Sequence, residues 1–338
     1  MRTYSFNTLR ERLRILSVSS ILLGMCIMLM FSCDPGDLDE MKDVDINDTT
    51  ENIEPIESDE YATYSYRRSI WLNSLGGLDS PQSIALYEDS MVALYYGATM
   101  KIFNLNTKSL EGSTKLPFEP YSHPHSNTIC FGKDFYSESD KYPLLYVSQW
   151  YVNSENGVLV FRILAEENKY DLQLLQLIRF DTSLTDIVGQ GPIDWVIDTD
   201  HDELYSIAFS LAGEDSFMVT EGNATVITRC RLPKFTEGKE VILKNEDIKD
   251  RYELEVFQYS QDKAYHNGHI YALAGYYVAP ESISLRDIDL TKRKIVSRID
   301  LSEYGGDPEG LSISRDGDLV FTWVYSSDLY TFSEWFNK

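Results

Sequence analysis

From residue 61 onward the chain alternates short apolar runs with polar breaks. The runs are rich in Val, Ile, Leu, Tyr and Phe, and Gly, Asp, Asn or Pro bounds them, as at residues 91–96, 144–148 and 319–323. No stretch with a helical apolar period reaches a convincing length. Short β-branched and aromatic runs between turn residues are typical of strands. The pattern therefore predicts an all-β domain over residues 61–338.

One unit recurs along this domain: a polar residue, a short strand, a tight turn and a more hydrophobic strand. Some of the turns are Asn-Gly or Asp-Gly, which favour hairpins. Two further strands follow in each of the first four units, and four strands per repeat around an axis is propeller architecture. The units start near residues 82, 126, 194, 261 and 309, and the further strands are expected at 100–105 and 112–116, 157–164 and 172–180, 224–232 and 240–243, and 284–290 and 295–301.

The fifth unit has three strands only, the last of them near residues 328–332. Tyr64–Leu72 can supply its fourth strand, and pairing the two ends of the domain would remove an exposed sheet edge. We therefore predict a five-bladed β-propeller that is closed by Tyr64–Leu72. A six-bladed propeller is the alternative, because 278 residues shared among six blades still give an ordinary blade length. A pair of β-sandwiches is the third choice and lacks a visible linker.

The first 33 residues follow a different pattern. Four Arg form a basic start, residues 15–31 are mostly apolar, and Ser32-Cys33 follows. A basic head, a short apolar core and a small residue before a cut site describe a signal peptide. A Cys at the cut site resembles the lipobox of bacterial lipoproteins, which implies a signal peptide at 1–32 and lipidation of Cys33. An uncleaved membrane helix is the alternative, although the apolar run is at the short limit for a bilayer.

Residues 33–60 form a strongly acidic segment. Twelve Asp and Glu and a single Lys lie between Asp34 and Glu60, with no aromatic residue. Such a segment cannot bury enough apolar surface to fold and extends by self-repulsion, so we expect a disordered tether. Acidic residues soon after the lipidated Cys resemble the surface-export signal of Bacteroidota lipoproteins. We expect an exported protein that is lipid-anchored (by palmitate) to the outer membrane, at the cell surface or the periplasmic face.

Charge limits the partners that the chain can have. The formal charge is −24, and residues 61–338 alone hold 41 Asp and Glu against 25 Lys and Arg. Binding to phosphate backbones depends on clustered Lys and Arg, so nucleic acid is not expected as a partner. Four Cys in 338 residues are far too few for a disulfide scaffold.

Polar residues open the innermost strand of each expected blade, at the mouth of the funnel where propellers usually bind ligands. A ring of amides, a His and carboxylates suits a glycan, a peptide or a cation. The alternative is that these residues cap neighbouring strands or hold channel water. Fold alone does not decide between the two. The candidate site residues are Gln82, His125, Asn127, Asp194, Gln261, Asp262 and Glu309.

We expect no cofactor, no metal site and no catalytic residue. His123-Pro124-His125 offers two imidazoles, whereas a metal site needs three or four ligands. The alternative is a hard cation such as calcium at Glu309, Asp194 or Asp262, because their carboxylates are oxygen ligands. No Gly-x-Ser-x-Gly elbow is present. Cys130 lies between apolar residues of an expected strand, which favours a place in the core.

Several stretches resemble the secreted propeller lipoproteins of Bacteroidota, a family of uncharacterised function. They are His123–Gly132, Tyr142–Gln149, Asp194–Asp198 and Gln261–Tyr271. The resemblance covers most of residues 61–338 and implies a propeller fold and an exported location. It carries over no catalytic residue, because no activity is established for the family.

Together these features predict a lipid-anchored extracytoplasmic β-propeller that acts as a non-catalytic binding or interaction module. Its ligand would be a glycan, a peptide or a partner protein of the outer membrane. The alternative is a hydrolase or lyase for a small extracellular substrate, with Glu309 and Asp194 or Asp262 as acid, base or cation ligands. A third hypothesis is a scaffold that docks to an outer-membrane complex without any small ligand.

Overall fold

The computed structural model divides the chain into two units, Met1–Glu54 and Pro55–Lys338. All residues that the structure describes belong to the second unit. The expected signal peptide, the lipidation site Cys33, the acidic tether and the candidate residue His125 lie outside the described residues. The described ranges are 66–71, 81–95, 97–117, 126–149, 157–166, 169–210, 223–257, 259–276, 279–302, 307–323 and 328–332.

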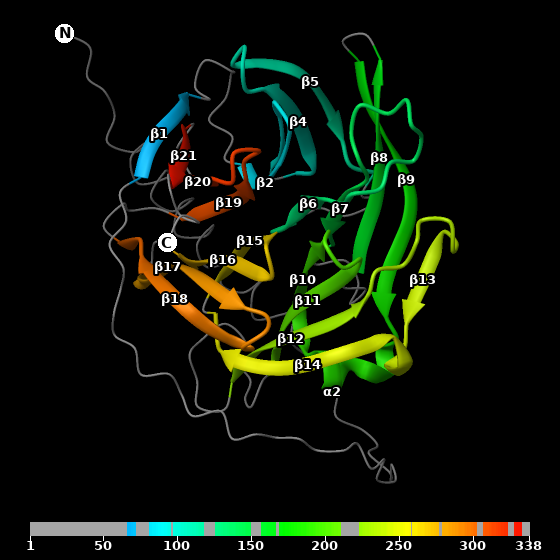
Figure 1. Ribbon diagram of the computed structural model, residues 1–338, viewed down its shortest axis with the longest axis vertical. Coiled ribbons are helices and arrows are strands. Elements are labelled where there is room, and N and C mark those ends of the chain that lie inside the picture. Colours follow the sequence, from blue (N-terminus) through cyan, green and yellow to red (C-terminus); the bar gives the residue numbers. More distant parts are fainter. Residues whose placement is uncertain are drawn as a thin grey trace, which may run out of the picture. The chain divides into compact units, whose positions relative to one another are not determined.

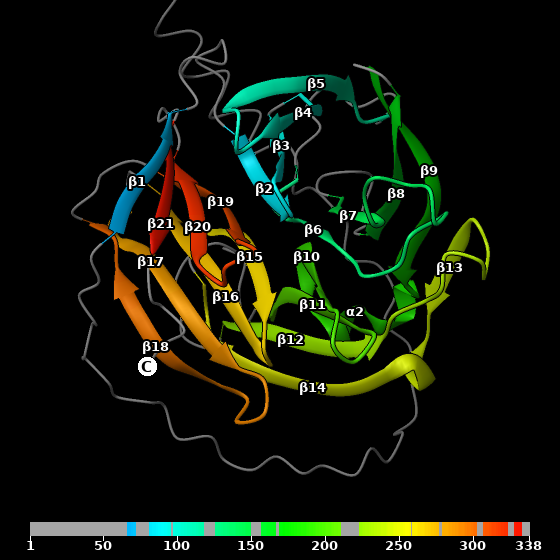
Figure 2. The ribbon, with the colours of Figure 1, turned by 45° about the horizontal axis from the view of Figure 1, so that its top comes forward.

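The strands of these ranges form five sheets that surround a common axis as the blades of a propeller (Figure 1, Figure 2). Blade 1 contains β2 (Pro81–Tyr87), β3 (Ser90–Tyr95), β4 (Thr99–Asn104) and β5 (Ser109–Lys115). Blade 2 contains β6 (Ile129–Phe131), β7 (Leu145–Ser148), β8 (Gly157–Glu166), β9 (Lys169–Phe180) and an additional outer strand, β13 (Glu240–Leu243).

The other three blades each have four strands. Blade 3 contains β10 (Gln190–Asp198), β11 (Glu203–Ser210), β12 (Ala224–Arg231) and β14 (Ile248–Glu255). Blade 4 contains β15 (Ser260–His266), β16 (His269–Tyr276), β17 (Ala279–Asp289) and β18 (Lys294–Asp300). Blade 5 contains β19 (Pro308–Ile313), β20 (Leu319–Trp323), β21 (Asp328–Phe332) and β1 (Tyr66–Trp71). The prediction of five blades is confirmed.

The closing strand is also confirmed. β1 pairs antiparallel with β21, from Tyr66 opposite Phe332 to Trp71 opposite Asp328. The fourth strand of blade 5 therefore comes from the opposite end of the domain, and both views show the two strands side by side (Figure 1, Figure 2). This pairing closes the ring and covers the outer edge of β21.

One expected strand has a different partner. Residues 240–243 were expected to be the outer strand of blade 3, and this prediction is wrong. As β13 they pair in parallel with β9, from Glu240 opposite Leu177 to Leu243 opposite Phe180. The outer strand of blade 3 is instead β14, which pairs with β12. The segment between β12 and β14 thus leaves its own blade and joins two blades together.

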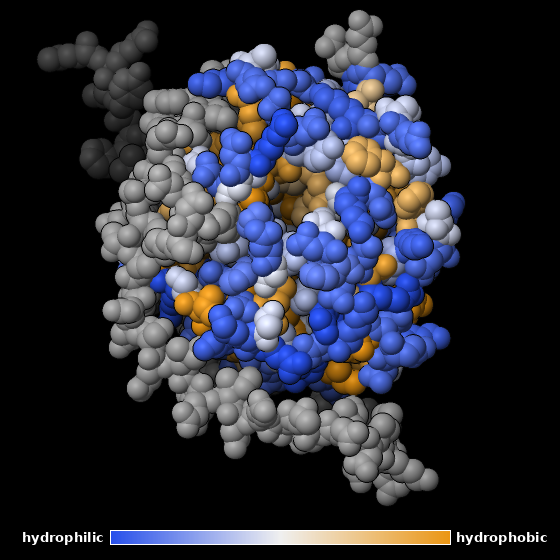
Figure 3. Space-filling view, in the orientation of Figure 1, coloured by the Kyte–Doolittle hydropathy of each residue, from blue (hydrophilic) through white to orange (hydrophobic). Residues whose placement is uncertain are grey.

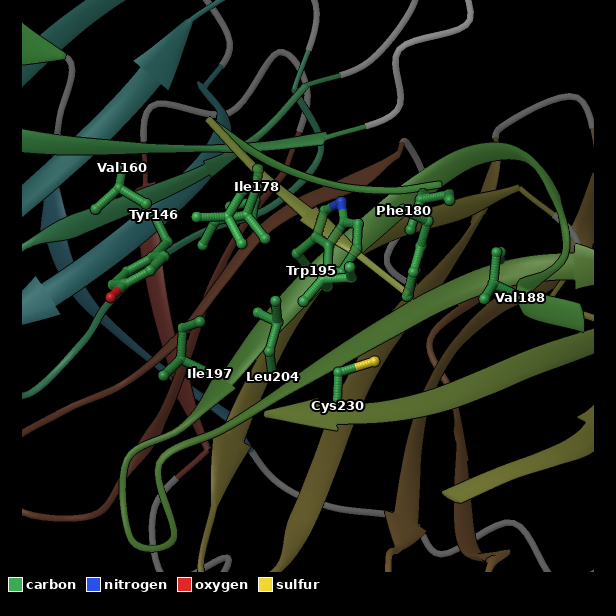
Figure 4. Close-up of a cluster of buried hydrophobic side chains, with 14 of the residues drawn as sticks. Tyr146, Val160, Ile178, Phe180, Val188, Trp195, Ile197, Leu204 and Cys230 are labelled. Atoms are coloured by element: carbon green, nitrogen blue, oxygen red, sulfur yellow. The ribbon is translucent and has the colours of Figure 1, made fainter. Parts of the chain in front are cut away.

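The hydrophobic core lies mainly between neighbouring blades. The largest cluster joins blades 2 and 3, with Trp195 buried and stacked on Phe180 at 4.9 Å between ring centroids. Figure 4 shows side chains of blade 2, such as Tyr146 and Ile178, next to Trp195 and Leu204 of blade 3. Both faces of a blade can carry apolar side chains, because successive residues of a strand point to opposite faces of the sheet. The blades are held by burial of apolar surface on both sides.

Helical structure is scarce in the described part of the chain. It consists of α2 (Thr185–Val188) and two short 3-10 turns, η2 (Thr182–Leu184) and η3 (Asn245–Asp247). None of these helices has the length and apolar character needed to cross a bilayer.

Candidate functional site

The N-terminal ends of the innermost strands define the candidate site. These strands are β2, β6, β10, β15 and β19, and each contacts the innermost strands of the next blades. Four of the five have a register shift at this end: between Pro81 and Ser83, Gln190 and Asp194, Ser260 and Lys263, and Pro308 and Leu311. Bulges re-aim side chains at the rims of such rings. They bring polar side chains of several blades to the axis.

We call nine of the buried polar residues at this end the axial cluster. All of them are at most 9 % exposed. They come from the start of β2, from the residues before β6 and after β7, and from the starts of β10, β15 and β19. The axial cluster consists of Gln82, Ser83, Asn127, Gln149, Asp194, Asp262, Lys263, Asp307 and Glu309.

Asp262 joins three blades through its carboxylate. Oδ2 accepts hydrogen bonds from the Ser83 hydroxyl (2.7 Å) and the Ile84 N–H (3.2 Å) of blade 1, and from the Leu311 N–H (2.8 Å) of blade 5. Oδ1 accepts from the N–H of Lys263 in its own blade (2.7 Å). The Ser83 oxygen in turn accepts from the Ile129 N–H of blade 2 (2.9 Å). One buried carboxylate therefore fastens blades that are not neighbours in the ring.

A glycine makes this approach of blade 5 possible. A Cβ on Gly310 would lie 2.7 Å from Thr322 Oγ1 and 3.0 Å from a methyl carbon of Ile84. The Gly310 N–H donates to the same Thr322 oxygen at 2.9 Å. Because no side chain separates β19 from β2 at this point, the next residue, Leu311, can donate its N–H to Asp262.

Asp194 and Lys263 form a buried ion pair between blades 3 and 4. The Lys263 ammonium group donates to Asp194 Oδ2 and to the backbone oxygen of Gln261. Both side chains are almost completely buried, at 0 % and 5 % exposure. Removing one partner of such a pair leaves an uncompensated buried charge, which is strongly destabilising. The pair thus connects the blades, as Asp262 does.

Asn127 and Gln149 contribute amide groups from blade 2. The Asn127 side-chain nitrogen donates to the backbone oxygen of Ser260 in blade 4 at 3.0 Å, which fixes the amide orientation. The Ser148 N–H donates to the oxygen of Thr128, which continues the β6–β7 pairing beyond Ile129 and Val147. Asn127 and Gln149 are the next residues on either side of this bond. Asn127 Oδ1 and Gln149 Oε1 are buried and have no hydrogen-bond partner among the described residues.

Glu309 and Asp262 are the two strongly perturbed acids of the axial cluster. Burial, and then the carboxyl groups of Asp307 and Asp262, raise the pKa of Glu309 well above the ordinary value, while a hydrogen bond with the Gln82 side chain opposes the shift. Glu309 Oε2 is buried and has no hydrogen-bond partner among the described residues. The pKa of Asp262 is also raised by burial, against the hydrogen bonds that it accepts. Both shifts favour the protonated form, and Glu309 differs from Asp262 in keeping one carboxyl oxygen without a partner among the described residues.

The candidate residues from the sequence fall into three groups. Gln82, Asn127, Asp194, Asp262 and Glu309 come together in the axial cluster. Gln261 lies beside it, but its side-chain nitrogen donates to the oxygen of Gly275 within blade 4 (3.2 Å). His125 lies outside the described residues.

Sequence reasoning missed four residues of the axial cluster: Ser83, Gln149, Lys263 and Asp307. Aligning the five repeats would have found Ser83, since it stands where blades 3 and 4 have Asp194 and Asp262. Lys263 occupies a position that is apolar in the other units. Gln149 was not findable from this alignment, because it lies at the end of a second strand.

The His and Cys residues of the described ranges do not join the axial cluster as a reactive group. His201 lies in the turn between β10 and β11, and His269 is the first residue of β16. Both are at the other end of the innermost strands, and each contacts an Asp: Asp198 at 3.0 Å and Asp287 at 2.6 Å. Cys130 and Cys230 are free thiols, and burial raises the pKa of each to about 12. The described residues contain no group of three or more His, Cys, Asp or Glu placed to hold a metal ion.

The strand order defines the chain as a five-bladed β-propeller with a polar axis. No family model matches the chain, and no curated protein matches it. Among solved structures it is similar to a glutaminyl cyclase of Myxococcus xanthus, with 11 % identity over 80 % of this chain and 97 % of that one and a TM-score of 0.45. It is also similar to a putative oxidoreductase (glucose dehydrogenase) of Thermus thermophilus, with 10 % identity over 80 % of this chain and 99 % of that one and a TM-score of 0.47.

A nidogen/laminin complex is a third similar structure, with 13 % identity over 70 % of this chain and 68 % of that one and a TM-score of 0.38. At these identities and scores the likenesses carry no argument about activity, and the blade count rests on the strand pairing of the chain itself.

Proposed function

We propose that this propeller is a non-catalytic binding module whose ligand site is the axial cluster. The observation that carries the proposal is a contrast between two sets of buried polar groups. Both carboxylate oxygens of Asp262 accept hydrogen bonds, whereas Asn127, Gln149, Asp194 and Glu309 each keep a buried acceptor oxygen without a described partner. Buried polar atoms normally have a hydrogen-bond partner. A ligand with several donors would give these oxygens theirs.

One face of the molecule is hollowed. Most of the face drawn in Figure 3 is hydrophilic, and a hollow with hydrophobic residues in its depth opens near its middle. Ligand sites commonly combine an apolar wall with a few placed polar groups. This supports binding of a small ligand or a short segment of a partner.

A screen of ligands on the full chain tests the proposal. Thermal unfolding would be measured with glycans, short peptides and Ca²⁺, and hits would be repeated on Gln149→Met, which removes one axial acceptor at similar length. Glu138→Ala, an exposed change in the β6–β7 loop, is the control. We expect at least one ligand to raise the midpoint in the unaltered chain and in the control, but less in Gln149→Met. If no ligand shifts the midpoint and Glu309→Ala melts unchanged, the scaffold hypothesis is favoured instead.

A hydrolase or lyase is the second candidate, and one observation favours it. Glu309 has a raised pKa beside a second carboxyl group, Asp307, and a carboxylic acid kept protonated near neutral pH is suited to general acid catalysis. If a ligand from the screen is converted to product by the unaltered chain but not by Glu309→Gln, the enzyme hypothesis replaces that of a binding module.

We further propose that the propeller is exported and held at the outer membrane by a lipid on Cys33, with residues 34–60 as a spacer. The support is the order of basic, apolar and small residues that ends at Cys33, followed by the acidic segment. Cys33→Ala should move the protein from the membrane fraction to the soluble fraction of cells, because the lipid is attached to the thiol. Retention of Cys33→Ala in membranes would refute the anchor.

A further inference from the structure

The loop between β6 and β7 is the longest connection between the first two strands of any blade. It spans residues 132–144, whereas Glu88 and Asp89 alone connect β2 to β3 in blade 1. The loop lies at the end of the innermost strands opposite the axial cluster, and both ribbon views show it over β8 and β9 (Figure 1, Figure 2). Long loops that a rigid scaffold positions commonly carry function.

Hydrogen bonds hold this loop in one conformation. The Gly132 N–H donates to the oxygen of Leu144 across the base of the loop at 2.9 Å. Arg162 of β8 donates two hydrogen bonds to the carboxylate of Asp140 (2.9 and 2.6 Å), and its guanidinium carbon lies 4.5 Å from the ring centroid of Tyr136. A surface that is fixed in advance loses little conformational entropy when a partner binds.

Two aromatic side chains are exposed on the loop. Phe135 is 38 % and Tyr136 is 42 % exposed, and the other large hydrophobic side chains that the described residues expose are aliphatic. Phe135 contacts Tyr87 of blade 1 (6.2 Å between ring centroids), and Tyr136 contacts Phe235 of the segment before β13 (5.6 Å). We call these four residues the loop patch. Exposed apolar patches mark interaction sites, and Tyr is enriched among the residues that dominate binding.

The angles between the rings favour a peptide over a glycan. The rings of Tyr87 and Phe135 meet at 72°, and those of Tyr136 and Phe235 meet at 44°. The loop patch is therefore uneven, because such rings meet edge to face or tilted and do not form one flat platform. Side chains of a peptide can insert between these rings, whereas a sugar chain needs a flat surface on which to stack.

Three carboxylates border one end of the loop patch. Glu88 and Asp89 follow Tyr87, and Asp134 precedes Phe135. All three residues are exposed, and none of their side chains forms an ion pair with another described residue. Their negative charge is therefore available to a partner.

The bases nearby are already paired, with one exception. Lys133 pairs with Asp202 at 2.6 Å, and Lys141 pairs with Glu111 at 2.9 Å. Lys234, at the other end of the loop patch, forms no ion pair with another described residue. Three unpaired carboxylates against one unpaired ammonium group leave an excess of negative charge. Such a surface attracts a basic partner and repels an acidic one.

We propose that the loop patch docks a segment of a partner protein that carries both apolar and basic side chains. Its apolar side chains would contact Phe135 and Tyr136, and its Lys or Arg side chains would face Glu88, Asp89 and Asp134. A basic side chain can also lie on the face of an exposed ring, which adds a cation–π contact. The loop patch and the axial cluster lie at opposite ends of the innermost strands, so this docking does not depend on the ligand proposed for the axis.

Three acetylated hexapeptide amides test the inference on the full chain. The first alternates Arg and Leu, the second alternates Arg and Ser, and the third alternates Glu and Leu. Calorimetric titration at about 0.15 M salt limits binding through distant charges. The Arg-Leu peptide should bind with a dissociation constant of about 0.1 mM, and the other two at least about tenfold more weakly.

Two results with these peptides would overturn the inference. If the Arg-Leu peptide does not bind, the loop patch is not a docking surface of this chemistry. If it binds no more tightly than the Arg-Ser or the Glu-Leu peptide, either charge alone or apolar contact alone explains the binding.

Variants with matched controls locate the binding. Phe135→Ser and Asp134→Lys should each weaken the Arg-Leu peptide about tenfold, because one loses apolar contact and the other reverses a facing charge. Val296→Ser, at a residue of blade 4 that is 39 % exposed, and Asp186→Lys, at an exposed residue of α2, make the same kinds of change elsewhere. Both controls should bind the peptide as the unaltered chain does.

The pattern across the variants decides where the peptide binds. Unchanged affinity in both loop variants, or an equal loss in loop variants and controls, overturns the inference. If Phe135→Ser does not fold, Asp134→Lys decides. Loss of binding in Gln149→Met with full binding in Phe135→Ser would assign the peptide to the axial cluster instead.

A neutral oligosaccharide separates the glycan alternative. Cellohexaose should not bind at the loop patch, because that surface lacks a flat stacking platform. If cellohexaose binds the unaltered chain and the Val296→Ser control but not Phe135→Ser, the loop patch is a glycan site and the inference of a peptide partner fails.

Discussion

At the scale of single residues, the axis depends on how one carboxylate meets its donors. Asp262 takes three hydrogen bonds on one oxygen and one on the other, from blades 1, 4 and 5. Three of these donors are backbone N–H groups, which cannot turn away to find another partner. Such a residue stabilises the ring by satisfying groups that the fold has already buried.

Removing this acceptor should be costly. In Asp262→Ala the N–H groups of Ile84, Lys263 and Leu311 lose their shared acceptor. We expect a loss of about 3–5 kcal/mol in the free energy of unfolding, because buried donors without partners cost about 1–3 kcal/mol each and part of this is recovered when the buried charge is removed. Urea unfolding measures it, with Glu138→Ala as the surface control. A loss below about 1 kcal/mol would show that Asp262 does not hold the blades.

Glu309 should make stability depend on pH. Its pKa is raised in the folded protein, so the folded state holds this proton more tightly than the unfolded state. The free energy of unfolding therefore falls as the pH rises above the ordinary pKa of a Glu, about 4.3, and no such effect exists below it. In Glu309→Gln this contribution is absent.

Urea unfolding at pH 5 and pH 8 checks the sign. Glu309→Gln should be close to the unaltered chain at pH 5 and more stable than it at pH 8. A stability difference between the two proteins that is the same at both pH values would contradict the assignment.

At the scale of elements, the segment between β12 and β14 is the unusual part of the ring. β13 adds a parallel strand to blade 2, and Val241 and Leu243 join the core between blades 2 and 3. The Gln176 side chain of β9 donates to the backbone oxygens of Lys234 and Gly238, both at 3.0 Å. The segment between β12 and β14 is therefore held in place by backbone pairing, by apolar burial and by one buried amide.

Gln176→Leu should loosen this segment selectively. This substitution removes the side-chain amide that donates to the two backbone oxygens, so we expect the free energy of unfolding to fall by about 1–3 kcal/mol. Hydrogen exchange should accelerate at residues 234–243 more than in blades 4 and 5. Uniform acceleration across all blades would mean that the segment is not a separate unit of stability.

Local pattern predicted most elements, and its failure has a physical reason. The Asn267-Gly268 and Asp316-Gly317 turns and the five unit starts follow from short-range signals, and the closing strand follows from the missing fourth strand of the fifth unit. The pattern marks residues 240–243 as a strand but cannot name their partner, because a parallel pair across two blades has no turn between its strands. The axial cluster shows the same limit. Polar residues at strand entries were predictable, but which of them bond between blades depends on contacts across the ring.

At the scale of the whole molecule, the ring is held at its seam and at its axis. The seam is the pairing of β1 with β21. At the axis, Asn127 of blade 2 reaches Ser260 of blade 4, and Asp262 of blade 4 reaches Ser83 of blade 1. These links cross the ring, so separating any two neighbouring blades also strains blades that are not their neighbours.

Loss of the seam should therefore affect the entire domain. A variant from which only residues 66–71 are deleted should unfold at a lower temperature and in a single transition. It should also associate, because the outer edge of β21 is exposed. Thermal unfolding and size-exclusion chromatography test this, with deletion of residues 44–49, an equal length outside the propeller, as the control. An unchanged midpoint would show that β1 is dispensable.

The pairing of β1 with β21 also sets an order of events during synthesis. β1 is the first described strand to leave the ribosome and its partner is the last, so β1 stays without its sheet until the chain is nearly finished. Contacts between such distant residues form slowly, because a long loop must close, at a cost in entropy, before these contacts can stabilise the chain. The propeller cannot complete its ring while the chain is still being made. Folding to the closed form is therefore a late step, one that leaves the chain open for as long as its carboxyl end is missing.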